Sequence, residues 1–373
     1  MVTQVRKSHS VAALVPGALV ALAIAALLQE PGRPQPPPVD LPPGFTAEIF
    51  AAGLGQPRGL TVDPAGTLIV SLPAQGRVIA LVGRPARAVT VAEGLELPHG
   101  LAFRHGDLYV GETGRIVRFR YDAKSHATRD PVVVAELPAG AHHWTRGIAF
   151  GPDGALYVSV GSSCDICREA DRRRAAIVRY GADGAGERLF ATGLRNPVGL
   201  AFHPRSGTLW TTVNERDWRR GGAPPDYVTE VREGGAYGWP DCYAERGVFA
   251  ADPELEDRRD CRDLTLPTFE VPAHSAPLGL AFYSGTAFPA PYRESLFVAM
   301  HGSRPELTLA GYKLVRVVFR GDRPAGIEDF ATGWRRGVRV WGRPVDIVAG
   351  PDGALYVSDD HGGRIVRIAF RAR

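Results

Sequence analysis

The chain has 373 residues, of which 45% are hydrophobic and 23% are charged, an ordinary globular composition that argues against wholesale disorder. Its 44 basic and 40 acidic residues leave a formal net charge of +4, too small and too dispersed to indicate a nucleic-acid-binding protein. The 44 glycines and 31 prolines favour many turns over long helices.

The first thirty residues differ in character from the rest. Arg6 and Lys7 precede an uncharged stretch from Val11 to Leu28, which is the pattern of an export signal. Because this stretch also reaches the lower limit for a membrane span, residues 1–30 are predicted to be a signal peptide or a membrane anchor. Residues 31–43 are rich in proline and predict an extended linker, and the folded domain is expected to span 44–373.

One short pattern returns six times along the remaining chain: a Pro or Thr, an apolar triplet, a turn and an alternating strand. The copies open at Pro57, Pro98, Thr145, Pro197, Pro277 and Pro344. Each copy holds two strands joined by a turn such as DPAG or GPDG. A third strand usually follows, and a further segment precedes most copies. Six four-stranded units predict an all-β fold, a six-bladed β-propeller.

The segment from Phe45 to Leu54 has the form of the outer segments but precedes the first copy. We expect it to supply the outer strand of the last blade, whose other strands come from the C-terminus. Such pairing would remove the open sheet edge. Two separate β-sandwiches are the alternative, but a sandwich does not require a repeated inner-strand phrase.

Insertions crowd into blades three to five, and in propellers such loops gather around the central channel, which makes that face the predicted site. His142 and His143 stand just before the third copy, where an imidazole could take a proton from a bound alcohol. Structural or exposed loop histidines are the alternative. The insertion of the fourth copy offers oxygen ligands suited to Ca²⁺, although acidic loops are common without a metal. These are Asn214, Glu215, Asp217 and Asp226.

Basic residues occur near the strands of several blades: Arg146, Arg195, Lys313 and Arg343. We expect the last three to occupy equivalent strand-entry positions, with Arg146 nearby. A ring of fixed positive charge around the channel would imply an anionic ligand. Arginines also lie across sheet surfaces, so each one alone is weak evidence.

The four cysteines allow three pairings. Disulfides between Cys164 and Cys167 and between Cys242 and Cys261 are favoured, since each would close a local loop in an oxidising compartment. A four-cysteine zinc site is the competing interpretation.

Several separated phrases together resemble the sorbosone dehydrogenase and soluble aldose sugar dehydrogenase family over about residues 44–370. They include HHWTRGIAFGPDGALYVSVGSSC, GLRNPVGLAF, HSAPLGLAFYSGTAFP, GYKLVRV and GRPVDIVAGPDGALYVSDDHGGRI. The resemblance implies that pyrroloquinoline quinone (PQQ) lies over the channel, with Ca²⁺ bridging cofactor and protein. It implies oxidation of an aldose sugar or a related alcohol or aldehyde by hydride transfer to the quinone. An external cytochrome or quinone would accept the electrons.

The resemblance also assigns roles to residues. The general base falls on HHWTR, where His143 is preferred because it directly precedes WTR, and His142 stays open. Arg195 and Asn196 match the residues that address the quinone carbonyls, and Arg195 would stabilise the developing oxyanion.

Further residues match the binding of the cofactor and its metal. Lys313 and Arg343 match contacts to the cofactor carboxylates, with Arg146 as a further cofactor-binding candidate. The metal-binding turn corresponds to Glu215, Arg216 and Asp217, with Asp226 as a further metal candidate.

The chain departs from this family where relatives have acidic residues, Trp and Asn, or a second cofactor-binding Arg. The departing residues are Arg219, Arg220, Arg304 and Val345. Two alternatives therefore stand beside the dehydrogenase: a metal-dependent, lactonase-like propeller hydrolase, and a non-catalytic ligand-binding propeller that has lost its cofactor. The expected location is periplasmic or extracellular, with membrane contact only through a possible N-terminal anchor.

Overall fold

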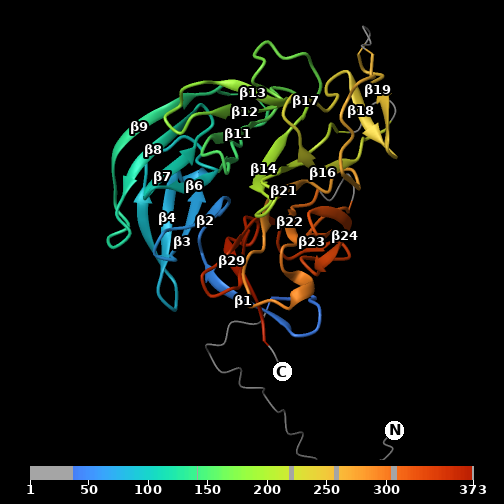
Figure 1. The fold of residues 1–373 in the computed structure, drawn as a ribbon. Coiled ribbons are helices and arrows are strands. Elements are labelled where there is room, and N and C mark those ends of the chain that lie inside the picture. Colours follow the sequence, from blue (N-terminus) through green and yellow to red (C-terminus); the bar gives the residue numbers. More distant parts are fainter. Residues whose placement is uncertain (1–36, 141, 218–221, 256–259, 304–308, 372–373) are drawn as a thin grey trace, which may run out of the picture. The chain divides into compact units, whose positions relative to one another are not determined.

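Six antiparallel sheets of four main strands each make up the computed structural model (Figure 1). The structure describes residues 37–140, 142–217, 222–255, 260–303 and 309–371. The expected signal or anchor, residues 1–30, lies outside them. Within the described ranges, no helix is long and apolar enough to cross a membrane. The predicted six-bladed β-propeller is confirmed.

The first three blades follow one another along the chain. The first contains β2 (Leu60–Val62), β3 (Leu68–Leu72), β4 (Arg77–Val82) and β5 (Arg87–Ala92). The second contains β6 (Leu101–Arg104), β7 (Asp107–Gly111), β8 (Arg115–Tyr121) and β9 (Thr128–Glu136). The third contains β10 (Ile148–Phe150), β11 (Leu156–Val160), β12 (Ala176–Tyr180) and β13 (Arg188–Thr192), extended by β17 (Gly235–Ala236).

The last three blades carry the longer insertions. The fourth contains β14 (Pro197–Phe202), β15 (Leu209–Val213), β16 (Asp226–Val231) and β20 (Phe269–Val271). The fifth contains β21 (Pro277–Phe282), β22 (Leu296–Met300), β23 (Lys313–Arg320) and β24 (Arg323–Ala331). The sixth contains β27 (Pro344–Ala349), β28 (Leu355–Asp359), β29 (Arg364–Phe370) and β1 (Phe45–Ala52). Two hairpins stand outside the blades, β18–β19 (Cys242–Glu245, Val248–Ala251) and β25–β26 (Arg335–Arg336, Arg339–Val340).

The two ends of the domain close the ring. Strand β1 pairs antiparallel with β29, with Phe45 opposite Phe370 and Ala52 opposite Arg364, and Figure 1 shows the blue β1 beside the red β29. This pairing confirms the expected closing strand, and β1 covers the edge that β29 would otherwise leave open.

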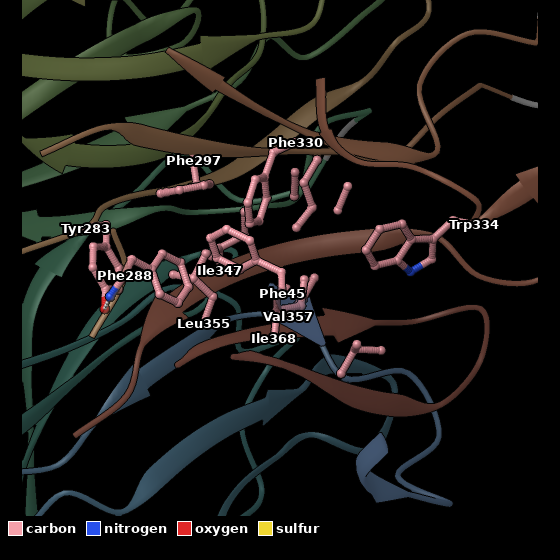
Figure 2. Packing of buried hydrophobic residues seen from close by; sticks show 14 of the residues in the cluster. Phe45, Tyr283, Phe288, Phe297, Phe330, Trp334, Ile347, Leu355, Val357 and Ile368 are labelled. Atoms are coloured by element: carbon pink, nitrogen blue, oxygen red, sulfur yellow. Dashed lines mark hydrogen bonds between the residues drawn. The ribbon is translucent and has the colours of Figure 1, made fainter. Parts of the chain in front are cut away.

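The hydrophobic core lies between neighbouring blades, with one cluster for each pair of adjacent sheets. Figure 2 shows the cluster between the fifth and sixth blades, where the ring of Phe45 packs edge-on against Phe288 and Phe330. Burying one such side chain contributes about 1.5–3 kcal/mol. The closing strand is therefore held by packing as well as by its hydrogen bonds.

The end of the proline-rich linker belongs to the folded body. Asp40 and Thr332 exchange backbone hydrogen bonds of 2.8 and 3.0 Å, and Val39 and Leu41 pack against the cluster of Figure 2. The folded part thus begins several residues before the expected boundary at Gly44.

Both expected disulfides are present, Cys164–Cys167 and Cys242–Cys261, and no cysteine is free. A four-cysteine zinc site is therefore wrong, because disulfide sulfurs are not thiolate ligands.

Inner strands of adjacent blades approach closely, and five of the six copies have a glycine at the third position of the repeat. A Cβ on Gly147 would lie 1.9 Å from the carbonyl oxygen of Val198 in the next blade. Gly59 faces the carbonyl of His99 in the same way. The sixth copy has Asp346 at this position, and its Oδ2 accepts a hydrogen bond of 2.8 Å from the backbone N–H of Leu60. The sixth blade is thereby joined to the first.

Replacing Gly147 by Ala should lower the free energy of unfolding by about 3 kcal/mol, because the added methyl overlaps backbone of the next blade. Gly326→Ala is the matched control: that glycine lies in β24, and an added Cβ would meet no atom within 4 Å. The control should leave stability unchanged or raise it by up to about 1 kcal/mol. Urea unfolding of the two variants checks this, and equal midpoints would contradict the close contact.

Candidate functional site

A polar pocket of about 390 Å³ is formed by loops at the ends of strands in blades three, four and five. Its lining residues are His142, His143, Arg195, Asn196, Asn214, Glu215, Asp217, Asp226, His274, Ala276 and Ser303. Eight of the residues singled out from the sequence as catalytic, cofactor-binding or metal-binding thus line one space.

A second cavity, of about 340 Å³, follows the inner strands, and its ionisable lining residues are His99 and Asp346. The remaining side chains of its wall are mostly apolar, from Leu60 through Leu101 to Ile347. The polar pocket therefore has the larger set of ionisable residues.

His143 is held as a neutral imidazole with a defined tautomer. Its Nδ1 lies 2.9 Å from both the carbonyl oxygen and the Oγ of Ser162. Since the Oγ hydrogen is donated to the carbonyl of Cys164, both Ser162 oxygens accept, and Nδ1 carries the proton. Burial, with the charge of Arg195 second, lowers the pKa of His143 to about 2. Its Nε2 is therefore the unprotonated nitrogen.

Arg195 forms the wall beside this histidine, and its side chain is 4% exposed. Nε donates to the carbonyl of Asp165 (2.8 Å), and Nη2 donates to the Asp165 carboxylate (2.8 Å). Nη1 donates to the carbonyls of Asn214 (3.0 Å) and Glu215 (2.8 Å). These bonds use four of the five guanidinium N–H groups, leaving one on Nη2 for a ligand.

Asn196 follows Arg195 and directly precedes β14. Its Oδ1 is buried and has no hydrogen-bond partner. A Cβ on Gly161 would come within 2.5 Å of that oxygen, so the glycine makes room for the amide. A buried amide oxygen without a donor is costly, which makes Asn196 a group that a ligand could satisfy.

Two carboxyl groups of the pocket, those of Glu215 and Asp226, are buried. Burial raises the pKa of Glu215 to about 7 and the pKa of Asp226 to about 7. The Asp226 carboxylate accepts hydrogen bonds of 2.8 Å from the backbone N–H groups of Glu215 and Ala276, which ties the fourth blade to the fifth. A nearby cation would favour the ionised form of both acids.

The carboxylates do not form a compact metal cage. Across the described ranges, only Cys164, Cys167 and Glu169 bring three potential ligand atoms within 4.8 Å of one another, and the two sulfurs are joined in a disulfide. Glu215, Asp217 and Asp226 line the pocket as separate oxygen donors. These carboxylates could therefore supply part of the oxygen ligands of a Ca²⁺ ion, and other ligands would have to complete its coordination.

Four residues expected at the site do not line the pocket. Lys313 forms an ion pair with Asp329 and borders a different cavity, of about 280 Å³. Because Lys313 begins β23, the third strand of its blade, the expectation of an equivalent strand-entry position is wrong for this residue. Arg343 does not line the pocket, and its guanidinium donates to the carbonyls of Gly302 and of the pocket-lining Ser303.

Arg146 and Arg216 are buried and do not line the pocket. Arg146 donates to the carbonyls of His143, Thr145 and Pro138 and so holds the loop that carries the histidines. The guanidinium of Arg216 pairs with Asp252, away from the pocket lining. A cationic side chain cannot bind a metal ion, so only the backbone of Arg216 could serve in the predicted metal turn.

Among the departures from the family pattern, Arg219, Arg220 and Arg304 lie outside the described residues, whereas Val345 is buried against Val198 and Leu278. Sequence reasoning missed Ser162, Asp165 and Ser303. The only signal for the first two is their place in the SSCDIC phrase after the third copy.

The fold and pocket define a propeller whose loops bring a neutral imidazole, an arginine and buried carboxyl groups to one pocket. The chain belongs to the TrAA12-like family, whose model matches residues 39–370. The resemblance found in the sequence, to PQQ-dependent sugar dehydrogenases, is confirmed.

Individual relatives span most of the domain. An uncharacterised protein of Borreliella burgdorferi is 29% identical, over 88% of this chain and 90% of that protein. The aldose sugar dehydrogenase of Escherichia coli is 25% identical, over 67% of each chain. The holo form of the pyranose dehydrogenase PQQ domain from Coprinopsis cinerea superposes with a TM-score of 0.77 at 21% identity, over 91% of this chain and 98% of that domain. The structural likeness shows the shared fold.

We expect His143 to remain neutral as the pH falls from 8 to 5, because a lowered pKa keeps the unprotonated form populated at acidic pH. ¹⁵N chemical shifts of the imidazole should show the Nδ1–H form throughout this range. A titration midpoint near 6.5, the ordinary value for histidine, would contradict the effect of burial.

Proposed function

We propose that the protein is a PQQ-dependent oxidoreductase that oxidises an aldose sugar or a related alcohol or aldehyde. The observation that carries the proposal is the pairing of a neutral His143, with Nε2 unprotonated, with Arg195 in one pocket. Oxidation of an alcohol requires a base for the hydroxyl proton and a positive group near the developing negative charge on oxygen. Relatives named as sugar dehydrogenases add support for this chemistry.

In this proposal, the hydroxyl group of the substrate donates a hydrogen bond to Nε2 of His143. The imidazole takes that proton while the Ser162 carbonyl, bonded to Nδ1–H, stabilises the imidazolium that forms. The remaining N–H of Arg195 donates to the oxygen that becomes negatively charged. His142, whose ring centroid lies 4.6 Å from that of His143, borders the same space and is the other candidate for the base.

The residues present fit a polar, anionic cofactor at this position. Asn196 offers a buried amide without a partner for its oxygen, and Arg195 offers one N–H and a positive charge. When bound, PQQ would supply the hydride acceptor. The expected contacts from Lys313 and Arg343 to cofactor carboxylates stay predictions, because neither side chain lines the pocket.

Calcium is proposed as the metal because the available donors are oxygens. Glu215 and Asp226 are buried carboxyl groups whose pKa values are raised to about 7, so a divalent cation would stabilise their charged forms. Asp217 provides a third carboxylate at the same pocket. A lactonase-like hydrolase stays the alternative, because it would use the same carboxylates to hold a metal that activates water.

An exported location is part of the proposal. The two disulfides fit an oxidising compartment, and residues 1–30 have the pattern of an export signal or anchor. Electrons would leave through an external acceptor, a cytochrome or a quinone.

Reconstitution of the purified full chain tests the function. We expect added PQQ and CaCl₂ to give bound cofactor absorbance and sugar-dependent reduction of a redox dye. Reconstitution with PQQ and EDTA in place of CaCl₂ should give neither. Lactone hydrolysis without PQQ would favour the hydrolase. Neither cofactor binding nor dye reduction would favour a non-catalytic propeller.

The identity of the base is tested by two single variants of the reconstituted protein. His143→Asn should lower kcat by about 10²- to 10⁴-fold while PQQ absorbance is retained, because the proton acceptor is lost. His142→Asn is the matched control and should leave kcat nearly unchanged. The opposite result would assign the base to His142.

A further inference from the structure

The tetrapeptide loop closed by the Cys164–Cys167 disulfide lies against the wall of the pocket, although it does not line it. Within this loop, Asp165 contacts Arg195 of the next blade. We propose that Asp165, held by the disulfide, is a positioning residue that fixes Arg195 and the turn after β15 in their places. As far as catalysis is concerned, this inference rests on the proposed function.

Asp165 binds two edges of the same guanidinium. Its carbonyl oxygen accepts from Nε of Arg195, and its Oδ1 accepts from Nη2, each at 2.8 Å. The other two acceptors of Arg195 are the neutral carbonyls of Asn214 and Glu215. Among these four bonds, Asp165 supplies the one negative charge, and its side chain is 13% exposed. A charge-assisted bond of this kind is roughly twice as strong as a neutral one.

The same carboxylate reaches the turn that carries the candidate metal ligands. Oδ1 of Asp165 also accepts a hydrogen bond of 3.0 Å from the backbone N–H of Asp217. One oxygen in the third blade therefore connects the guanidinium of Arg195 with the chain between Asn214 and Asp217 in the fourth. A shift of Asp165 would move both the positive group and the carboxylate turn.

The loop is also connected to the candidate base. Ser162 Oγ donates a hydrogen bond of 2.7 Å to the carbonyl of Cys164, and the Ser162 backbone N–H donates to the carbonyl of Arg195 at 2.8 Å. Ser162 in turn binds Nδ1 of His143. The disulfide restricts the backbone conformations of a four-residue segment whose neighbours orient the imidazole and the guanidinium.

The Cys242–Cys261 disulfide provides a matched comparison. It also closes a loop, of sequence separation 19, in the insertion of the fourth blade, but neither cysteine lines the pocket. Loss of a disulfide in general can thus be separated from loss of the Asp165 contact.

Covalent labelling of Arg195 tests the positioning without any need for catalysis. Phenylglyoxal reacts with accessible arginines, and peptide mapping reports the rate at Arg195 in the full chain. Asp165→Ala and the double variant Cys164→Ser/Cys167→Ser should raise that rate about tenfold or more, because the guanidinium gains freedom to leave its carbonyl cradle. Asp165→Asn, which keeps the shape but removes the charge, should give an intermediate rate.

Two controls should leave Arg195 as protected as in the unchanged protein: Cys242→Ser/Cys261→Ser, and Asp130→Asn, whose exposed carboxylate pairs with Arg129. Circular dichroism establishes that each variant is folded. If Asp165→Ala does not fold, Asp165→Asn and the Cys164→Ser/Cys167→Ser variant decide the result.

For the reconstituted enzyme, Asp165→Ala should lower kcat about 10- to 100-fold, since a misplaced guanidinium stabilises the transition state poorly. It should also weaken binding of CaCl₂ to the apoprotein in calorimetry, which a loss of folding stability elsewhere would not do. Unchanged Arg195 labelling in folded Asp165 variants would overturn the inference. If the unchanged protein shows no PQQ-dependent activity, the proposed function fails, and the labelling still decides the positioning.

Discussion

The close approach of the inner strands is the constraint on which the rest of the structure depends. At Gly147 and Gly59, there is no room for a side chain between the backbone of one blade and the carbonyl of the next. Hydroxyl groups strengthen the same contact, since Ser71 donates to the carbonyl of His99 and Ser159 to that of Val198. Asp346 makes the contact between the sixth blade and the first through its side chain, and together these contacts bring the loops at the strand ends around one space.

Several of the ionisable side chains around this space are buried, so water screens their charges little. The positive charge of Arg195 is surrounded by carbonyl oxygens and Asp165, and the neighbouring Glu215 and Asp226 are buried carboxyl groups. The same positive charge adds to burial in lowering the pKa of His143, which keeps the imidazole neutral in the pocket. The polar pocket and the neutral histidine are thus two results of one electrostatic arrangement.

Contacts between blades also position the site from behind. Arg146 holds the histidine loop through three backbone carbonyls, and the Asp226 carboxylate joins two blades through backbone N–H groups. The Asp165 carboxylate likewise joins two blades, by accepting a hydrogen bond from the guanidinium of Arg195. Several charged side chains near the pocket therefore bind backbone groups. Fewer charged groups are left to bind a ligand than the sequence alone suggests.

The sequence by itself determined the architecture and the composition of much of the pocket. The repeated phrase, with its turn residues and alternating strands, is a local pattern, so it predicted six blades and the closing strand. The closeness of the cysteines along the chain predicted both disulfides. It also placed His143 and Arg195 in loops before inner strands, which the ring then brings together.

Only the tertiary structure decided which partner each charged side chain takes. Lys313 pairs with Asp329 of the adjacent strand, and Arg146 turns to backbone carbonyls. Asp165 and Arg195 lie 30 residues apart in the chain, in different blades, and nothing in the repeat relates them. The physical reason is that a backbone pattern is set by neighbours in sequence, whereas the direction of a long charged side chain is set by the acceptors that folding brings within reach.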